Sequence, residues 1–193
     1  MPSTEDIPPL GLPYEGKLIH EVSGGEGEWM PFDKIKLYTN AFIRQKGKIL
    51  LGYKKRGFGS DMYNGFGGKV EPGETSAQAA VRELEEESGV TAPLRRCGTL
   101  FFLLEGTKAA FHIELFVADE YSGDITETDE MRPEWFSDGS DAKSELPAIP
   151  FERMWADDVF WMPMLLANRP FVGRGDFTKD NKMKKWWFAE QVV

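Results

Sequence analysis

Three glutamates near the middle of the chain have a spacing that could do metal chemistry. Glu83, Glu86 and Glu87 stand at positions i, i+3 and i+4, so a helix would place them on one face. Like charges at this spacing repel each other, which weakens an isolated helix. One interpretation is a solvated acidic surface, and the other is a divalent-cation site, since Mg²⁺ prefers carboxylate oxygens. Arg82 is placed to hold one of these carboxylates in position.

A glycine-rich turn followed by a helix would position these glutamates. The turn contains Gly65, Gly67 and Gly68, and a second turn follows at Pro72-Gly73. Glycine allows a close approach of the backbone to a ligand and accepts positive φ. We expect the helix to begin at Thr75 or Ser76 and to end at Gly89. Its apolar face is predicted from residues at three- and four-residue spacing: Ala77, Ala80, Val81 and Leu84.

The same segment carries a longer pattern. Gly68 is followed after five residues by Glu74, and after seven more by the run Arg-Glu-Leu-Glu-Glu-Glu-Ser-Gly-Val, which ends at Val90. This segment resembles the Nudix box, GX5EX7REUXEEXGU, at every specified position. The resemblance implies an α+β (Nudix) fold, with a mixed β-sheet sandwiched between α-helices. It also implies a hydrolase that uses Mg²⁺, with Mn²⁺ as an alternative, to cleave a diphosphate linked to another moiety.

Bulk properties limit the partners. A chain of 193 residues, 41% hydrophobic and 28% charged, is typical of a globular domain with its own core. The net charge of −9 argues against binding to a nucleic-acid polymer, which needs a basic surface. The longest apolar run, 160–167, is interrupted by Pro163 and is too short for a membrane span. We expect a monomer that acts on a small nucleotide. Its expected location is the cytoplasm, with the nucleus or mitochondria as alternatives.

The first 34 residues differ from the rest of the chain. They are rich in proline and glycine and show little periodicity, so we interpret residues 1–34 as an N-terminal extension and 35–193 as the Nudix domain. The extension would pack against the domain through its larger apolar residues, which are Leu10, Tyr14, Trp29 and Phe32. We expect the site to lie downstream of it. Strands are predicted over 36–43, 48–54, 95–104, 110–119, 171–177 and 185–188, and a second helix over 159–168.

A closer resemblance extends over about residues 36–190. The segments 50–90, 129–136 and 150–163 are similar to the branch of the Nudix family that hydrolyses oxidised purine nucleoside triphosphates such as 8-oxo-dGTP. The resemblance implies a role in nucleotide pool sanitation, which prevents DNA damage. Metal or catalytic positions carried over are Gly67, Glu83, Glu86, Glu87 and Glu130. Substrate-binding positions carried over are Lys54 on the phosphate side, and Thr39, Phe58, Asn64, Phe102, Phe111, Trp155, Asp157 and Asp158 around the base.

Departures from this branch concern the width of the base pocket. Leu104 stands where the branch has a second phenylalanine, and Phe111 where it has methionine. The loop 138–148 is longer, and the extension is additional. The family's attack at the β-phosphorus gives a monophosphate and pyrophosphate, with Glu87 or Glu130 as the carboxylate that accepts the proton. Two alternatives are another Nudix substrate, such as ADP-ribose, a dinucleoside polyphosphate or a capped RNA end, and a non-catalytic Nudix-fold binding module.

Adjacent acids offer a way to read a purine edge. Asp157 and Asp158 cannot both ionise cheaply in one small site, so one should have a raised pKa. A protonated carboxyl donates while its ionised neighbour accepts, which suits the alternating edge of guanine. The alternative interpretation is that one of them caps the following helix.

Overall fold

The computed structural model describes residues 8, 9 and 11–192, which form two compact units. Unit 1 contains the described residues up to 37, with 97–114 and 156–192, whereas unit 2 contains 38–96 and 115–155. Three strands contribute residues to both units, and these are β2 (Lys34–Gln45), β6 (Arg95–Leu104) and β7 (Ala109–Ala118). The bounds of β6 are those predicted from the sequence, and those of β2 and β7 differ from the predicted ones by one or two residues at each end.

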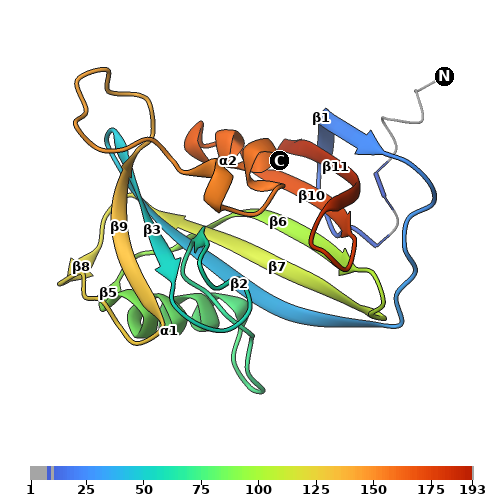
Figure 1. The fold of residues 1–193 in the computed structure, drawn as a ribbon, viewed down its shortest axis with the longest axis horizontal. Helices are drawn as coiled ribbons and strands as arrows, with labels where there is room; N and C mark the ends of the chain where they lie inside the picture. Colours follow the sequence, from blue (N-terminus) through green and yellow to red (C-terminus); the bar gives the residue numbers. More distant parts are fainter. Residues whose placement is uncertain (1–7, 10, 193) are drawn as a thin grey trace. The chain divides into compact units, whose positions relative to one another are not determined.

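Unit 1 is built on strands in the order β1-β11-β10-β6-β7 (Figure 1). β10 (Phe171–Phe177) is antiparallel to β11 (Met183–Val192) and parallel to β6, so the sheet is mixed, as predicted. The short helix α2 (Asp158–Leu166) packs on β10 and β11. Trp161 stacks on Phe171 with ring centroids 5.5 Å apart, and Phe160 stacks on Trp186 and Phe188. These aromatic contacts hold the start of α2 against the sheet.

The N-terminal segment supplies a strand that the sequence analysis did not predict. β1 (Lys17–Gly25) pairs antiparallel with β11, from Lys17 opposite Val192 to Gly25 opposite Lys185. Leu12 is buried in the same apolar cluster as strands β6 and β10, and Trp29 and Phe32 pack against that cluster as expected. Of the other residues expected to pack, Tyr14 is 46% exposed, and Leu10 lies outside the described residues. Packing therefore joins residues 11–34 to the strands of unit 1.

A buried ion pair binds this segment to β10. The guanidinium of Arg174 donates to Asp176, with Nε 3.0 Å from Oδ1, and both side chains are 1% exposed. Asp176 Oδ2 also accepts from the backbone N–H of Met30 at 2.6 Å, and Arg174 donates to the carbonyl of Met30 at 2.7 Å. The Arg174 guanidinium lies over the ring of Trp29, at 4.7 Å from its centroid. One buried pair thus satisfies both backbone groups of Met30.

Unit 2 carries the long helix. Strand β3 (Lys48–Lys54) is antiparallel to β2, to β4 (Tyr63–Asn64) and to β9 (Met131–Ser137). β5 (Val90–Thr91) and β8 (Ser122–Gly123) form a separate two-stranded pair, and a 3₁₀ turn, η2, spans Phe151–Arg153. Helix α1 (Ser76–Ser88) packs on a core formed by apolar residues of these elements, which are Ala41, Ile43, Leu50, Phe66, Ala80, Leu84, Val90, Phe116 and Ala118.

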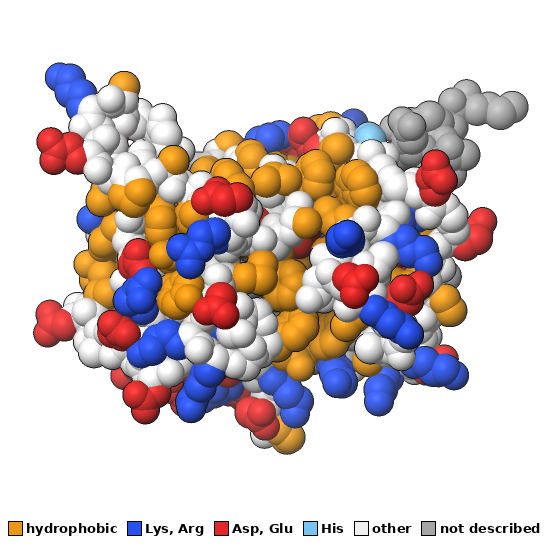
Figure 2. Space-filling model, viewed as in Figure 1, with side chains coloured by type: hydrophobic (Ala, Val, Ile, Leu, Met, Phe, Trp, Pro, Cys, Tyr) orange, Lys and Arg blue, Asp and Glu red, His pale blue; other side chains and the backbone are white. Residues whose placement is uncertain are grey.

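The surface carries both charged and apolar side chains. On the face shown in Figure 2, acidic and basic side chains are interspersed with apolar ones. Ion pairs at the surface of unit 2 include Lys55–Glu127 and Arg132–Glu134. In the described part of the chain, neither helix has the length and apolar character needed to cross a membrane.

Candidate active site

Helix α1 presents the predicted glutamates because both of its ends are fixed locally. Thr75 and Gln78 form a capping box, in which each side chain accepts from the other residue's backbone N–H. Gly89 ends the helix with φ of +76°, and its N–H donates to the carbonyl of Glu85. The buried side differs from the predicted one, since Ala77 and Val81 are exposed. The correct buried residues are Ala79, Ala80, Leu84, Glu87 and Ser88.

The inward side of helix α1 carries a carboxylate, which is a group that could take part in chemistry. Glu87 is 4% exposed, and its Oε2 accepts from the backbone N–H of Gly67 at 2.8 Å. Burial raises the pKa of Glu87 to about 7, against the opposing effect of nearby Lys54. Gly67 has to be glycine here, since a Cβ would collide with the carbonyl of Thr39. The expected proximity of Gly67 to the acidic face is confirmed.

Arg82 holds the outer part of the acidic face. Its guanidinium lies 2.8 Å from Glu83 and 3.2 Å from Glu86, and it also contacts Glu74 at 2.7 Å. Hydrogen bonding to Arg82 keeps the pKa of Glu74 below its ordinary value. Glu83 is half-buried, and burial raises its pKa although Arg82 opposes the shift. One arginine therefore ties three of the box carboxylates together, where the sequence analysis expected one.

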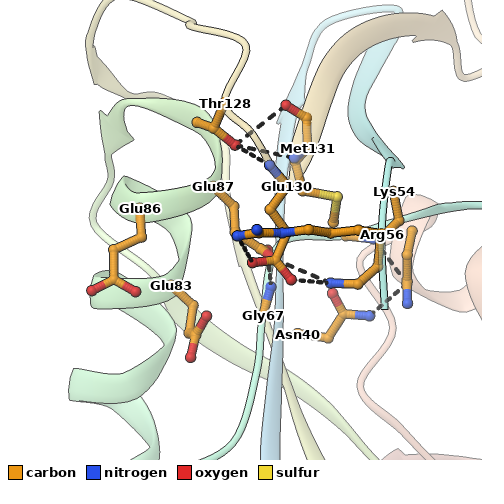
Figure 3. Close-up of polar contacts among 12 residues, drawn as sticks. Asn40, Lys54, Arg56, Gly67, Glu83, Glu86, Glu87, Thr128, Glu130 and Met131 are labelled. Atoms are coloured by element: carbon orange, nitrogen blue, oxygen red, sulfur yellow. Dashed lines mark hydrogen bonds and ion pairs between the residues drawn. The ribbon is translucent and has the colours of Figure 1, made fainter. Parts of the chain in front are cut away.

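Glu130 supplies a further carboxylate from another part of the chain. Glu130 lies in the turn before β9, where its backbone N–H and that of Met131 donate to Thr128 Oγ1, at 3.3 and 3.0 Å. Its side chain accepts from Lys54 Nζ at 2.8 Å, and Arg56 lies 3.8 Å away. The hydrogen bond from Lys54 lowers the pKa of Glu130. Figure 3 shows Glu83, Glu86 and Glu87 on the helix, with Glu130 and the basic side chains beyond them.

The donor set fits a hard divalent cation. Its members are carboxylates from two elements, and the charges of Glu83 and Glu130 each disfavour ionisation of Glu87, so a cation among them would be stabilising. Within the described residues, no three acidic side chains are already gathered at ligating distance. Instead, Arg82 holds the outer carboxylates, and Lys54 lies between Glu130 and Glu87.

Four predicted base-pocket residues belong to unit 2. Thr39 is buried, and its Oγ1 has no hydrogen-bond partner among the described residues. Asn64 Oδ1 accepts from Asn40 Nδ2 and from Gly65 N–H, both at 2.8 Å, which fixes the orientation of its amide. Phe58 is 73% exposed and stacks on Trp155, with centroids 5.1 Å apart and planes at 26°. A buried hydroxyl without a partner and an exposed aromatic ring are groups that a ligand could satisfy.

The other four belong to unit 1. Phe102 meets Phe177 edge to face, and Phe111 lies beneath Lys36 Nζ, at 5.7 Å from the ring centroid. Asp157 and Asp158 are 1% and 2% exposed at the start of α2. Asp157 occupies the N-cap position of α2, as one alternative expected, but its side chain makes no cap hydrogen bond. Instead, Asp157 Oδ2 accepts from the indole N–H of Trp161 at 2.8 Å.

The environment of Asp157 suits the recognition of a polar edge. Burial raises its pKa to about 6, which is the expected direction, although the expected cause was a neighbouring carboxylate; the Trp161 hydrogen bond opposes the shift. Its Oδ1 is buried without a partner in the described structure. Trp161 and Asn40 were not among the site residues predicted from the sequence. Trp161 stands at i+4 from Asp157, and that spacing on a helix was the available signal.

The amino-acid sequence matches a known protein family. Residues 38–164 match the NUDIX domain. The chain belongs to the NUDIX family. This NUDIX protein is 47% identical over 139 residues to a zebrafish (Danio rerio) oxidized purine nucleoside triphosphate hydrolase, covering 72% of the chain and 84% of the relative. It is 43% identical over 156 residues to the mouse (Mus musculus) protein described in the same words, covering 80% and 95%.

Solved structures agree with the fold. The crystal structure of a mutator MutT protein from Bacillus halodurans superimposes with a TM-score of 0.65 at 25% identity. The match covers 79% of this NUDIX protein and 97% of the bacterial chain. The predicted α+β class, with a mixed sheet and two α-helices, is therefore confirmed.

Proposed function

We propose that this NUDIX enzyme hydrolyses oxidised purine nucleoside triphosphates of the 8-oxo-dGTP type to the monophosphate and pyrophosphate, which would cleanse the nucleotide pool. The observation that carries the proposal is the similarity to two hydrolases of that description, over 72% and 80% of the chain. The chain retains every acidic residue of the box, which a binding module without catalysis would not need.

The proposed metal site consists of Gly67, Glu83, Glu86, Glu87 and Glu130. The charge repulsion of Glu83 and Glu87 with neighbouring carboxylates supports it. A bound Mg²⁺, or Mn²⁺ in its place, would offset triphosphate charge and orient the attacking water. The chain's own part is to hold the carboxylates in place through Gly67 and Arg82, and to accept a proton on a carboxylate.

The proposed base site consists of residues with groups suited to a purine. Asn64 both donates and accepts, with its orientation fixed by Asn40. Asp157 and Asp158 would bind the polar edge of the base, and Phe58 and Trp155 offer stacking surface. The family resemblance also assigns Thr39, Phe102 and Phe111 to base binding, and it assigns Lys54 to the phosphates.

The test is a substrate panel. Release of pyrophosphate from 8-oxo-dGTP, an oxidised dATP, dGTP and dATP would be measured with Mg²⁺, together with cleavage of ADP-ribose. We expect the oxidised purine triphosphates to have the highest kcat/KM. Glu87→Gln should abolish that activity in the same preparation, which ties it to this site. A higher kcat/KM for ADP-ribose than for any oxidised triphosphate would overturn the proposed substrate.

A further inference from the structure

Lys54 occupies an unusual position within the carboxylate group. Its ammonium lies between carboxylates from two separate segments of the chain, 2.8 Å from Glu130 Oε1 and 3.5 Å from Glu87 Oε1. The Lys54 side chain is 18% exposed and that of Glu87 only 5%. Partial burial strengthens such contacts relative to an exposed pair, because water screens them less. Lys54 therefore supplies positive charge at the point where the acidic group is most buried.

The two cations of the site differ in how firmly they are held. Arg82 contacts three carboxylates, one of which, Glu74, lies outside the proposed metal site. Lys54 contacts only members of the proposed metal site in the ion pairs that the structure shows, Glu87 and Glu130. Its backbone is fixed at the end of β3 by hydrogen bonds with Asp61 and Met62, both at 2.9 Å, whereas its side chain has four rotatable bonds.

We propose that Lys54 is a placeholder cation, which neutralises Glu87 and Glu130 until a divalent cation replaces it, and whose released ammonium then binds the substrate's phosphates. The inference rests on the proposed function, because it takes its metal site from there. The new point is that a bound metal ion and the ion pairs of Lys54 with Glu87 and Glu130 exclude each other. A compact ammonium suits this role, since it is a point charge with no fixed geometry to lose.

The exchange makes a distinctive prediction about metal affinity. If Lys54 only positioned the glutamates, its removal would weaken metal binding. If it competes with the metal, its removal should strengthen metal binding. Lys54→Met should therefore bind Mn²⁺ more tightly, by roughly three- to tenfold in Kd, which is the scale of a modest ion pair. Arg56 would still lie near Glu130, so the effect should arise mainly at Glu87.

Mn²⁺ binding to the full chain without nucleotide would be measured by electron paramagnetic resonance. All variants would be measured at about pH 8.5, on the alkaline side of the pKa of Glu87, because removing Lys54 takes away a charge that lowers this pKa. Lys55→Met is the matched control, because it removes the same charge from a lysine paired with Glu127 instead. It should change the Kd by less than about twofold. Lys54→Arg keeps the positive charge and should therefore not show the tighter Mn²⁺ binding expected of Lys54→Met.

A second measurement tests the released ammonium. With Ca²⁺ saturating, binding of inorganic triphosphate would be followed by calorimetry, and Lys54→Met should bind it several-fold more weakly than Lys55→Met. Unchanged or weaker Mn²⁺ binding by Lys54→Met, while Glu87→Gln loses Mn²⁺, would overturn the exchange and leave the proposed metal site standing. If Glu87→Gln also binds Mn²⁺ normally, the proposed metal site itself is misplaced.

Discussion

The ion pair between Arg174 and Asp176 gives the sharpest test of how the N-terminal segment is held. In Asp176→Asn, the guanidinium of Arg174, 1% exposed, would lose its carboxylate partner inside unit 1. Breaking a buried pair by removing one partner costs about 3–5 kcal/mol, because a buried charge is left uncompensated. For a chain of this size, each kcal/mol lowers Tm by about 2–4 °C, so we expect Tm to fall by roughly 6–20 °C.

The same variant should loosen the segment before β2. Asp176 accepts from the backbone N–H of Met30, and Arg174 donates to its carbonyl, so both contacts depend on the pair. Thermal denaturation followed by circular dichroism would give Tm, and limited proteolysis with mass spectrometry would show cleavage within residues 17–34. Asp119→Asn is the matched control, since it removes an exposed carboxylate that pairs with Arg44, at a cost of about 0–1 kcal/mol. Equal Tm values for the two variants would show that the buried pair does not stabilise this segment.

Four further predictions follow from the site and the fold. Glu87→Gln should lower kcat by about 100-fold or more with KM measured in parallel, and near-normal turnover would remove Glu87 from the site. The pKa of Glu87 is raised to about 7, so the folded state favours its protonated carboxyl. The resulting stabilisation is present below about pH 4.5 and is lost as the pH rises to 7. The metal-free protein should therefore lose up to about 3 kcal/mol over this window, and Glu87→Gln should lose less when Tm is followed against pH. At least one of Asp157→Asn and Asp158→Asn should change the ratio of kcat/KM for 8-oxo-dGTP to that for an oxidised dATP, and equal losses on both substrates would contradict selection by the pair. Deleting residues 1–30 removes β1 and several core contacts, so the truncated chain should unfold at a lower temperature in calorimetry, and an unchanged Tm would show that this packing contributes little.

Features set by local geometry were predictable from the sequence. The helix ends where its cap residues indicate, because Thr75 with Gln78 and Gly89 satisfy backbone groups within a few residues. The strands over 48–54 and 171–177 also have the predicted bounds. The apolar face of α1 was only partly predicted, since Val81 has the right spacing but faces outward, while Glu87 faces inward. Hydrophobic spacing alone does not say which of two adjacent stripes meets the core.

The helix, its glutamates at i, i+3 and i+4, and the glycine turn before them follow from local sequence, because caps and helical periodicity are properties of short segments. The contacts of those glutamates depend on the tertiary fold. Lys54 and Glu130 are separated by 76 residues, and their contact depends on the antiparallel register of β3 with β9. Likewise, Met30 and Asp176 are separated by 146 residues. Burial and neighbouring charge set the pKa of Glu87, and both come from chain segments that only the complete fold brings together.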